Sequence, residues 1–129
     1  MTGATVALLM IGERLDVCID PTCAYFDDVV RRAATAPVVP VEAWIGANPN
    51  RCHENCEELS RRTRDYVIRG WLVAGGHWLM PHSVLRRVAT GELVDITPRS
   101  DEFPFVEHLR SEQDFIVLRQ GRDGGWLHP

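Results

Sequence analysis

The sequence predicts an α+β fold in which a helix carrying two cysteines packs on an antiparallel β-meander. Residues from about 50 to 66 place Cys52, Cys56 and Leu59 at helical spacing, so these three side chains share one helix face. From residue 66 onward, short apolar runs alternate with turns that contain glycine, which is typical of antiparallel strands. A helix followed by consecutive strands is an α+β order.

Length and composition favour one globular domain, residues 1–129, that is large enough to bury its own core. Hydrophobic residues make up 45% of the chain and charged residues 25%, which argues against disorder. The net charge of −4 and the lack of a long basic run argue against nucleic acid as a partner. All 14 basic residues are arginines, which excludes Schiff-base chemistry on lysine and a phosphate loop built on lysine.

The N-terminal apolar run, residues 5–11, is too short to span a bilayer and lacks the basic region and cleavage site of a secretory signal. We interpret it and residues 14–20 as short buried strands. These features predict a cytoplasmic protein with no membrane partner, in which all four cysteines are reduced. Reduced cysteines favour metal binding or catalysis over a disulfide framework.

The remaining elements follow from periodicity and from turn residues. Residues 21–35 have helical spacing, and residues 36–50 contain three prolines, which predicts an extended crossing and then a turn. Asn48 and Asn50 are candidate N-caps for the helix that carries the cysteines. Strands are expected at residues 66–76 and 82–97 (with a turn around Gly91), further short elements at 104–110 and 114–121, and a tail at 122–129.

Cys52 is the strongest candidate for a functional residue. A cysteine in the first turn of a helix meets unpaired backbone N–H groups and the positive end of the helix dipole, and both favour the thiolate. The same N–H groups can stabilise an oxyanion on an attacked carbonyl. A thiol nucleophile also needs a histidine base that is oriented by a carboxylate, and His82 and Asp95 follow in that order on consecutive predicted strands.

This arrangement resembles the transglutaminase-like branch of the papain-like cysteine enzymes, over about residues 48–98. In that family the nucleophilic cysteine opens a helix, and a meander carries the histidine and then the aspartate, often in an "H-x-V … D-x-T-P" setting. Residues 82–84 ("HSV") and 95–98 ("DITP") fit this setting. The resemblance implies a Cys52–His82–Asp95 triad that hydrolyses, deamidates or transfers the acyl group of a peptide, protein or small-molecule amide, without a cofactor.

Three further residues are candidates for oxyanion or substrate binding. Asn55 lies inside the helix, where asparagine is a poor helix former, so its amide is a candidate oxyanion donor. His53 either faces solvent or contacts substrate, because as an immediate neighbour it is not expected to turn back onto the Cys52 sulfur. Trp71 either walls a cleft beside the site or packs in the core.

The triad makes a geometric demand on the strand connection after His82. A tight two-residue turn would place Asp95 opposite Arg86, four residues and about 13 Å along the strand from His82. A wide or bulged connection with Leu85 opposite Glu92 would place His82 directly opposite Asp95. We therefore predict a wide connection at this point.

The alternative to a thiol enzyme is a non-catalytic domain, either stabilised by zinc or acting as a binding module. Its zinc ligands would be Cys18, Cys23, Cys52 and Cys56, of which the last two share a helix face. Neither pair has the C-x2-C spacing of common structural zinc sites, and each cysteine is also explained as a small core residue. The sequence predicts neither the substrate nor the oligomeric state.

Overall fold

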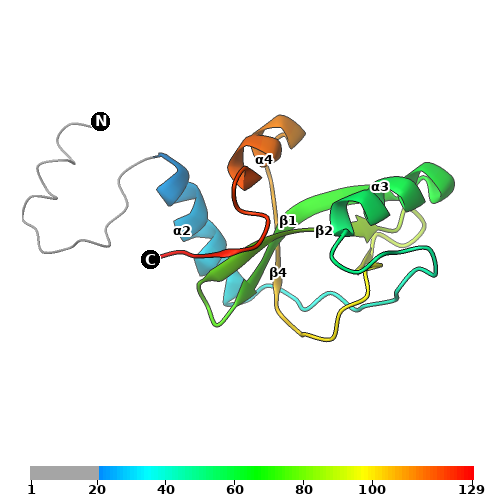
Figure 1. Ribbon diagram of the computed structural model, residues 1–129, viewed down its shortest axis with the longest axis horizontal. Helices are drawn as coiled ribbons and strands as arrows, with labels where there is room; N and C mark the ends of the chain where they lie inside the picture. The colour runs from blue at the N-terminus through cyan, green and yellow to red at the C-terminus, as the bar shows by residue number, and fades with distance from the viewer. Residues whose placement is uncertain (1–20) are drawn as a thin grey trace, which may run out of the picture.

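A computed structural model describes residues 21–129, in which three helices accompany one curled antiparallel sheet (Figure 1). This confirms the predicted α+β class, while the two strands predicted before residue 21 lie outside the described residues. The elements, in chain order, are α2 (Pro21–Ala33), α3 (Cys52–Thr63), β1 (Tyr66–Ala74), β2 (Trp78–Arg86), β3 (Leu93–Val94), β4 (Phe105–Glu107), α4 (Glu112–Arg119) and β5 (Trp126–Leu127).

The sheet is built on a long hairpin, in which β1 and β2 pair along their whole length. β4 pairs with the other edge of β1. On the edge of β2 that β1 leaves free, β3 pairs at Leu85 and Arg86, and β5 pairs at Trp78 and Leu79. Among residues 21–129, the stretch of β2 between these two short strands has no strand partner on that edge, and His82 lies within it.

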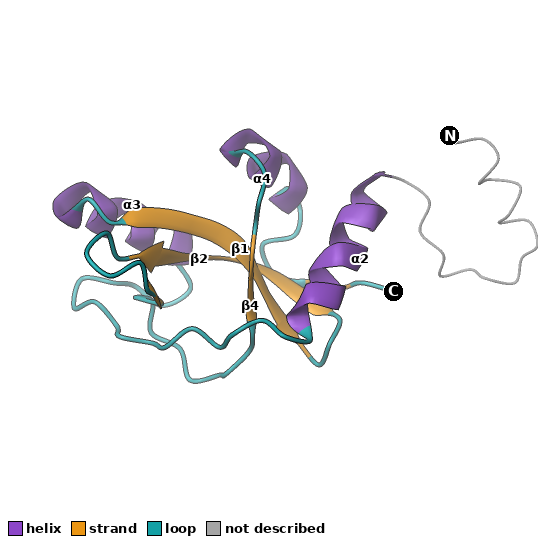
Figure 2. Cartoon of the chain, turned by 180° about the vertical axis from the view of Figure 1, so that it is seen from behind, coloured by secondary structure: helices purple, strands orange, loops and turns teal. Residues whose placement is uncertain are grey.

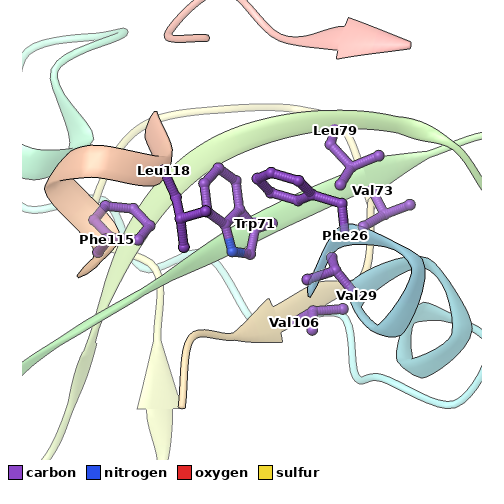
Figure 3. Packing of buried hydrophobic residues seen from close by; sticks show 8 residues of the cluster. All are labelled: Phe26, Val29, Trp71, Val73, Leu79, Val106, Phe115 and Leu118. Atoms are coloured by element: carbon purple, nitrogen blue, oxygen red, sulfur yellow. The ribbon is translucent and has the colours of Figure 1, made fainter. Parts of the chain in front are cut away.

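One face of the sheet carries the main hydrophobic core. Trp71 from β1 and Leu79 from β2 pack there with Phe26 from α2 and Phe115 from α4 (Figure 3). The Trp71 ring lies between the two phenylalanine rings, each with its centroid 5.1 Å away. Leu85 points to the same face and packs with Cys56 of α3. The alternation of side chains along a strand therefore gives all three helices the same face to cover.

Extended segments rather than helices cover the opposite face, as the teal loops below the sheet in Figure 2 indicate. Leu72 and Val84 point to this face and pack with Val39 and Phe105. The His82 ring lies on this face too, edge-on to the Phe105 ring at a centroid distance of 6.3 Å.

Gly70 allows the strands to approach closely beside the site. It is paired with His82 on one side and with Glu107 on the other. A side chain at this position would overlap the Val106 carbonyl oxygen, and its Cβ would lie 2.6 Å from the Phe105 ring. Glycine is therefore required here for β4 to pack against β1.

The connection between β2 and β3 is wide, as predicted, but its register differs from the predicted one. Residues 87–92 form the connection, and Leu85 pairs with Val94 instead of with Glu92. Continuing this register places Asp95 level with Val84, two residues from His82 on the same face. Side chains offset by two residues on neighbouring strands remain within reach of each other, so the two meet diagonally rather than directly opposite.

Several element boundaries also differ from the prediction. The helix with the cysteines ends at Thr63, so Tyr66 is not part of its apolar stripe. Tyr66 begins β1, as the predicted strand 66–76 requires, and it is exposed. The second strand starts earlier, at Trp78, and part of the predicted tail pairs with it as β5. No helix among residues 21–129 is long and apolar enough to cross a membrane.

The three cysteines within residues 21–129 differ in their chemical state. Cys23 in α2 is disulfide-bonded, so the prediction that all four cysteines are reduced is wrong for this residue. Cys52 and Cys56 are free thiols. Cys18 lies outside the described residues.

Candidate active site

Cys52 is the first residue of α3, so its position in the first turn is as predicted. The N-cap is Arg51 rather than Asn48 or Asn50, and its side chain makes no capping hydrogen bond. The first N–H groups of a helix have no partner within the helix. At this uncapped end they remain available to a negative charge near the Cys52 sulfur.

His82 and Asp95 form a buried hydrogen-bonded pair. The His82 Nε2–H donates to Asp95 Oδ2 at 2.6 Å, and Asp95 is 0% exposed. The His82 ring also lies beside Cys52, because its hydrogen bond and its charge lower the pKa of the Cys52 thiol. The fold thus brings together all three residues of the predicted triad.

The pair of Cys52 and His82 favours the charged forms of both groups. Burial by itself raises the pKa of the Cys52 thiol, but hydrogen bonds from His53 and His82 outweigh it and lower this pKa to about 6. Burial lowers the pKa of His82, but hydrogen bonds with Asp95 and Cys52 raise it to about 9. A thiolate and an imidazolium are therefore paired between about pH 6 and pH 9.

Asp95 is held by three donors and remains ionised. Besides His82, the Arg99 Nε–H donates to Oδ2 at 2.6 Å and the Thr97 N–H donates to Oδ1 at 3.1 Å. Burial raises the pKa of the Asp95 carboxyl, but His82, Arg99 and Thr97 together hold this pKa below its ordinary value. Sequence reasoning missed Arg99, although a basic residue four positions after the predicted acid was the available signal.

Asn55 connects the helix that carries the nucleophile to the segment after β3 that carries the acid. Its amide donates to the Asn48 carbonyl oxygen and to Thr97 Oγ1, both at 2.9 Å, and its Oδ1 accepts from the Asn48 N–H at 3.0 Å. Both amide protons are used, which leaves none for the predicted oxyanion contact. Thr97 in turn binds Asp95, so Asn55 positions the site rather than contacting substrate.

His53 lies closer to the nucleophile than predicted. Its Nδ1 lies 2.6 Å from Ser83 Oγ, and its hydrogen bond and its charge lower the pKa of the Cys52 thiol. This placement is possible because β2 lies beside the first turn of α3, and Ser83 gives the ring a fixed partner there. The sulfur of Cys52 therefore has two imidazole neighbours.

Trp71 and Cys56 belong to the interior. Trp71 is fully buried and its indole N–H donates to Tyr25 Oη at 2.8 Å, so it lies in the core instead of lining a cleft. Cys56, one turn after Cys52, is also fully buried. Burial raises the pKa of the Cys56 thiol far above its ordinary value, and the negative charge on Cys52 raises it further. Cys56 therefore stays protonated.

A metal centre needs several ligands close together. No cluster of three or more histidine, cysteine, aspartate or glutamate residues that could hold a metal ion occurs within residues 21–129. Cys23 is on α2 and disulfide-bonded, whereas Cys52 and Cys56 are on α3. The proposed fourth zinc ligand, Cys18, lies outside this range.

Comparison with known proteins gives no match to a protein-family model, to a curated protein or to a solved structure. The functional interpretation therefore depends on the residues of the site themselves.

Proposed function

We propose that the protein is a thiol-dependent acyl-group enzyme with a Cys52–His82–Asp95 triad, of papain-like or transglutaminase-like architecture. Amide hydrolysis, deamidation and acyl transfer share this machinery. The substrate is the carboxamide or activated acyl group of a peptide, protein or small molecule.

One observation carries this proposal: the His82 ring, held by the buried Asp95 at 2.6 Å, lies beside Cys52, where its hydrogen bond and its charge lower the pKa of the thiol. A nucleophile, a base that contacts it and a carboxylate that orients the base define this type of catalytic site. The uncapped N-terminus of α3 adds backbone N–H donors next to the sulfur.

The chemistry proceeds in two steps. The Cys52 thiolate attacks the carbonyl carbon, a C–S bond forms, and the π electron pair moves onto the oxygen. When the oxyanion collapses, the bond to the leaving amine breaks and the His82 imidazolium gives this amine its proton, which leaves a thioester on Cys52. Neutral His82 then takes a proton from water or from an acceptor amine, which attacks the thioester and releases the thiolate.

Acylation by p-nitrophenyl acetate tests the proposal. At neutral pH the wild-type protein should release a burst of p-nitrophenolate and gain one acetyl group, which peptide mass spectrometry locates on Cys52. Cys52→Ala should abolish the burst, and His82→Ala should slow it by about 100-fold or more.

Cys56→Ala is the matched control, because Cys56 is on the same helix but is fully buried and protonated. This variant should be acylated at the wild-type rate. If the acetyl group is absent from Cys52, or if Cys52→Ala gives the same burst as wild type, the protein is not a thiol acyl enzyme of this kind.

A further inference from the structure

Arg69 lies next to the candidate site, on the face of the sheet that the helices cover. It is on β1, directly opposite Ser83 of β2, the residue after His82. Its side chain points to the helical face, because Trp71, two residues later on the same strand, packs there. The side chain is only 12% exposed. A cation that is buried to this extent needs partners for its charge and for its N–H groups.

Three different elements supply the partners of this guanidinium. On α4, Glu112 accepts from Arg69 Nε at 3.1 Å and from Nη2 at 3.0 Å. On α3, Glu57 accepts from Nη2 at 2.6 Å. On β2, Ser83 Oγ accepts from Nη1 at 2.9 Å. Arg69 therefore joins the helix that carries the nucleophile to the strand that carries the catalytic base.

The contacts of Arg69 and Ser83 reach α3 on one side of the helix. Ser83 Oγ also hydrogen-bonds His53 Nδ1 at 2.6 Å, and His53 is four residues before Glu57. At about 3.6 residues per turn, residues four apart lie on the same side of a helix. Arg69 and Ser83 therefore hold this side of α3 at two successive turns.

Cys52 lies between this side of α3 and the side that Asn55 holds. Counting about 100° per residue, His53 lies about 100° from Cys52 in one direction and Asn55 about 60° in the other. Asn55 binds Thr97, so its side of the helix is fixed to the segment of the triad carboxylate. Anchors on both sides oppose rotation of α3 about its axis. Such a rotation would move the nucleophilic sulfur relative to the catalytic base.

We propose that Arg69 is a positioning residue that sets the rotation of α3 through Glu57 and Ser83. Its effect on the reaction is to keep the Cys52 sulfur beside His82. This inference rests on the proposed acyl-group function, but it predicts the reactivity of the thiol as well as the acylation rate.

Glu57→Ala tests the proposal by removing the direct link between Arg69 and α3. Loss of a nearby negative charge would by itself favour the thiolate and lower the thiol pKa. Release of α3 acts in the opposite direction, because Cys52 loses the hydrogen bond and the charge of His82. In folded Glu57→Ala, the midpoint of iodoacetamide alkylation should therefore rise toward that of His82→Ala. The burst with p-nitrophenyl acetate should slow by about 10- to 100-fold.

Glu58→Ala is the matched control. Glu58 is the next residue on α3 and its side chain is similarly exposed, but it pairs with Arg61 and Arg62 of the same helix. The variant removes the same charge without breaking a contact to another element, so its alkylation midpoint and burst rate should match wild type. Glu57→Gln retains an acceptor for Arg69 and should lie between Glu57→Ala and wild type.

Arg69→Met tests the arginine itself. It should slow the burst at least as much as Glu57→Ala does. Adding Glu57→Ala to Arg69→Met should slow it by no more than a further factor of about two, because both changes break the same link. Arg69→Lys retains the charge but lacks the fork that reaches three elements, so it should recover only part of the lost rate.

The inference is overturned if Glu57→Ala has the alkylation midpoint and the burst rate of Glu58→Ala, or if the effects of Glu57→Ala and Arg69→Met multiply. If Arg69→Met does not fold, the comparison of the two glutamate variants decides alone. Failure of the proposed function looks different, since wild type itself would then not be acylated at Cys52. The alkylation midpoints would still test the rotation of α3 in that case.

Discussion

Asp95 is the residue at which the most contacts of the site converge. It accepts hydrogen bonds from His82, Arg99 and Thr97, and none of its surface is exposed. Its backbone is also fixed, because its N–H donates to the Pro40 carbonyl and its own carbonyl accepts from Glu42. A carboxylate held in this way can orient His82 without moving during the reaction.

Arg99 is predicted to keep Asp95 ionised, and Arg99→Gln tests this. A carboxyl whose pKa is lowered in the folded state contributes stability at high pH and loses it as the pH falls through that pKa. Without Arg99 the Asp95 pKa rises, so this loss should begin at a higher pH. Breaking a buried ion pair should also lower the free energy of unfolding by about 3 kcal/mol. Chemical denaturation measured over a range of acidic pH values gives both quantities.

Arg110→Gln is the control for that variant. Arg110 pairs with Asp114 on the surface at 3.1 Å, and such pairs contribute about 0–1 kcal/mol. If Arg99→Gln resembles Arg110→Gln in stability and in its acid dependence, Arg99 does not maintain the charge on Asp95.

At the scale of elements, the site depends on how α3 is joined to the segment that follows β3. Asn55 on α3 makes hydrogen bonds to Asn48 and to Thr97, and Thr97 binds Asp95. The helix that carries the nucleophile and the segment after β3 that carries the acid are therefore held together by one amide. This link acts across 42 residues of sequence.

We expect Asn55→Ala to weaken both the fold and the site. The loss of buried hydrogen bonds leaves the Asn48 backbone groups unpaired, which should lower the free energy of unfolding by about 2–3 kcal/mol. The p-nitrophenolate burst should also slow, because the N-terminus of α3 is no longer fixed relative to Asp95. Urea denaturation and burst kinetics measure the two effects.

Asn48→Ala is the matched comparison, because Asn48 takes part through its backbone while its side chain is exposed. It should change the free energy of unfolding by no more than about 0.5 kcal/mol. Equal denaturation midpoints for the two variants would show that the Asn55 amide does not hold the helix in place.

Local patterns were sufficient to predict α3, the β1 strand and the order Cys52, His82, Asp95. Helical spacing and strand runs are properties of neighbouring residues, so they are visible in a single sequence. The exact register of β3 could not be predicted from local patterns, because hydrogen bonds with the remote segment around Pro40 fix the position of Asp95. The orientation of His53 also depends on a distant partner, Ser83, thirty residues along the chain.

At the scale of the whole molecule, most of the main core lies apart from the candidate site, and the two meet where the His53 ring packs edge-on to Phe115 at a centroid distance of 5.9 Å. Phe26, Trp71 and Phe115 join α2, the sheet and α4 in one cluster (Figure 3). The site lies instead at the N-terminus of α3, where Cys56 packs with Leu85 in a separate cluster. Global stability and the reactivity of Cys52 should therefore respond to different substitutions.

Phe26→Ala tests this separation. Phe26 is buried, and removal of its ring should lower the free energy of unfolding by about 3–5 kcal/mol. Under conditions in which the variant is folded, the pH dependence of Cys52 alkylation should match wild type. Ile45→Ala, at a fully exposed position, should leave both properties unchanged. A shifted alkylation profile in folded Phe26→Ala would show that the core and the site are coupled.

The most direct test of the account is the pH dependence of Cys52 alkylation by iodoacetamide, in wild type and in His82→Ala. The thiolate is the reacting form, so the rate rises as the pH increases through the thiol pKa. The account predicts a wild-type midpoint near pH 6. In His82→Ala the midpoint should move up toward the ~8.5 of a free cysteine. An ordinary midpoint in wild type that His82→Ala leaves in place would contradict the central claim that His82 activates Cys52.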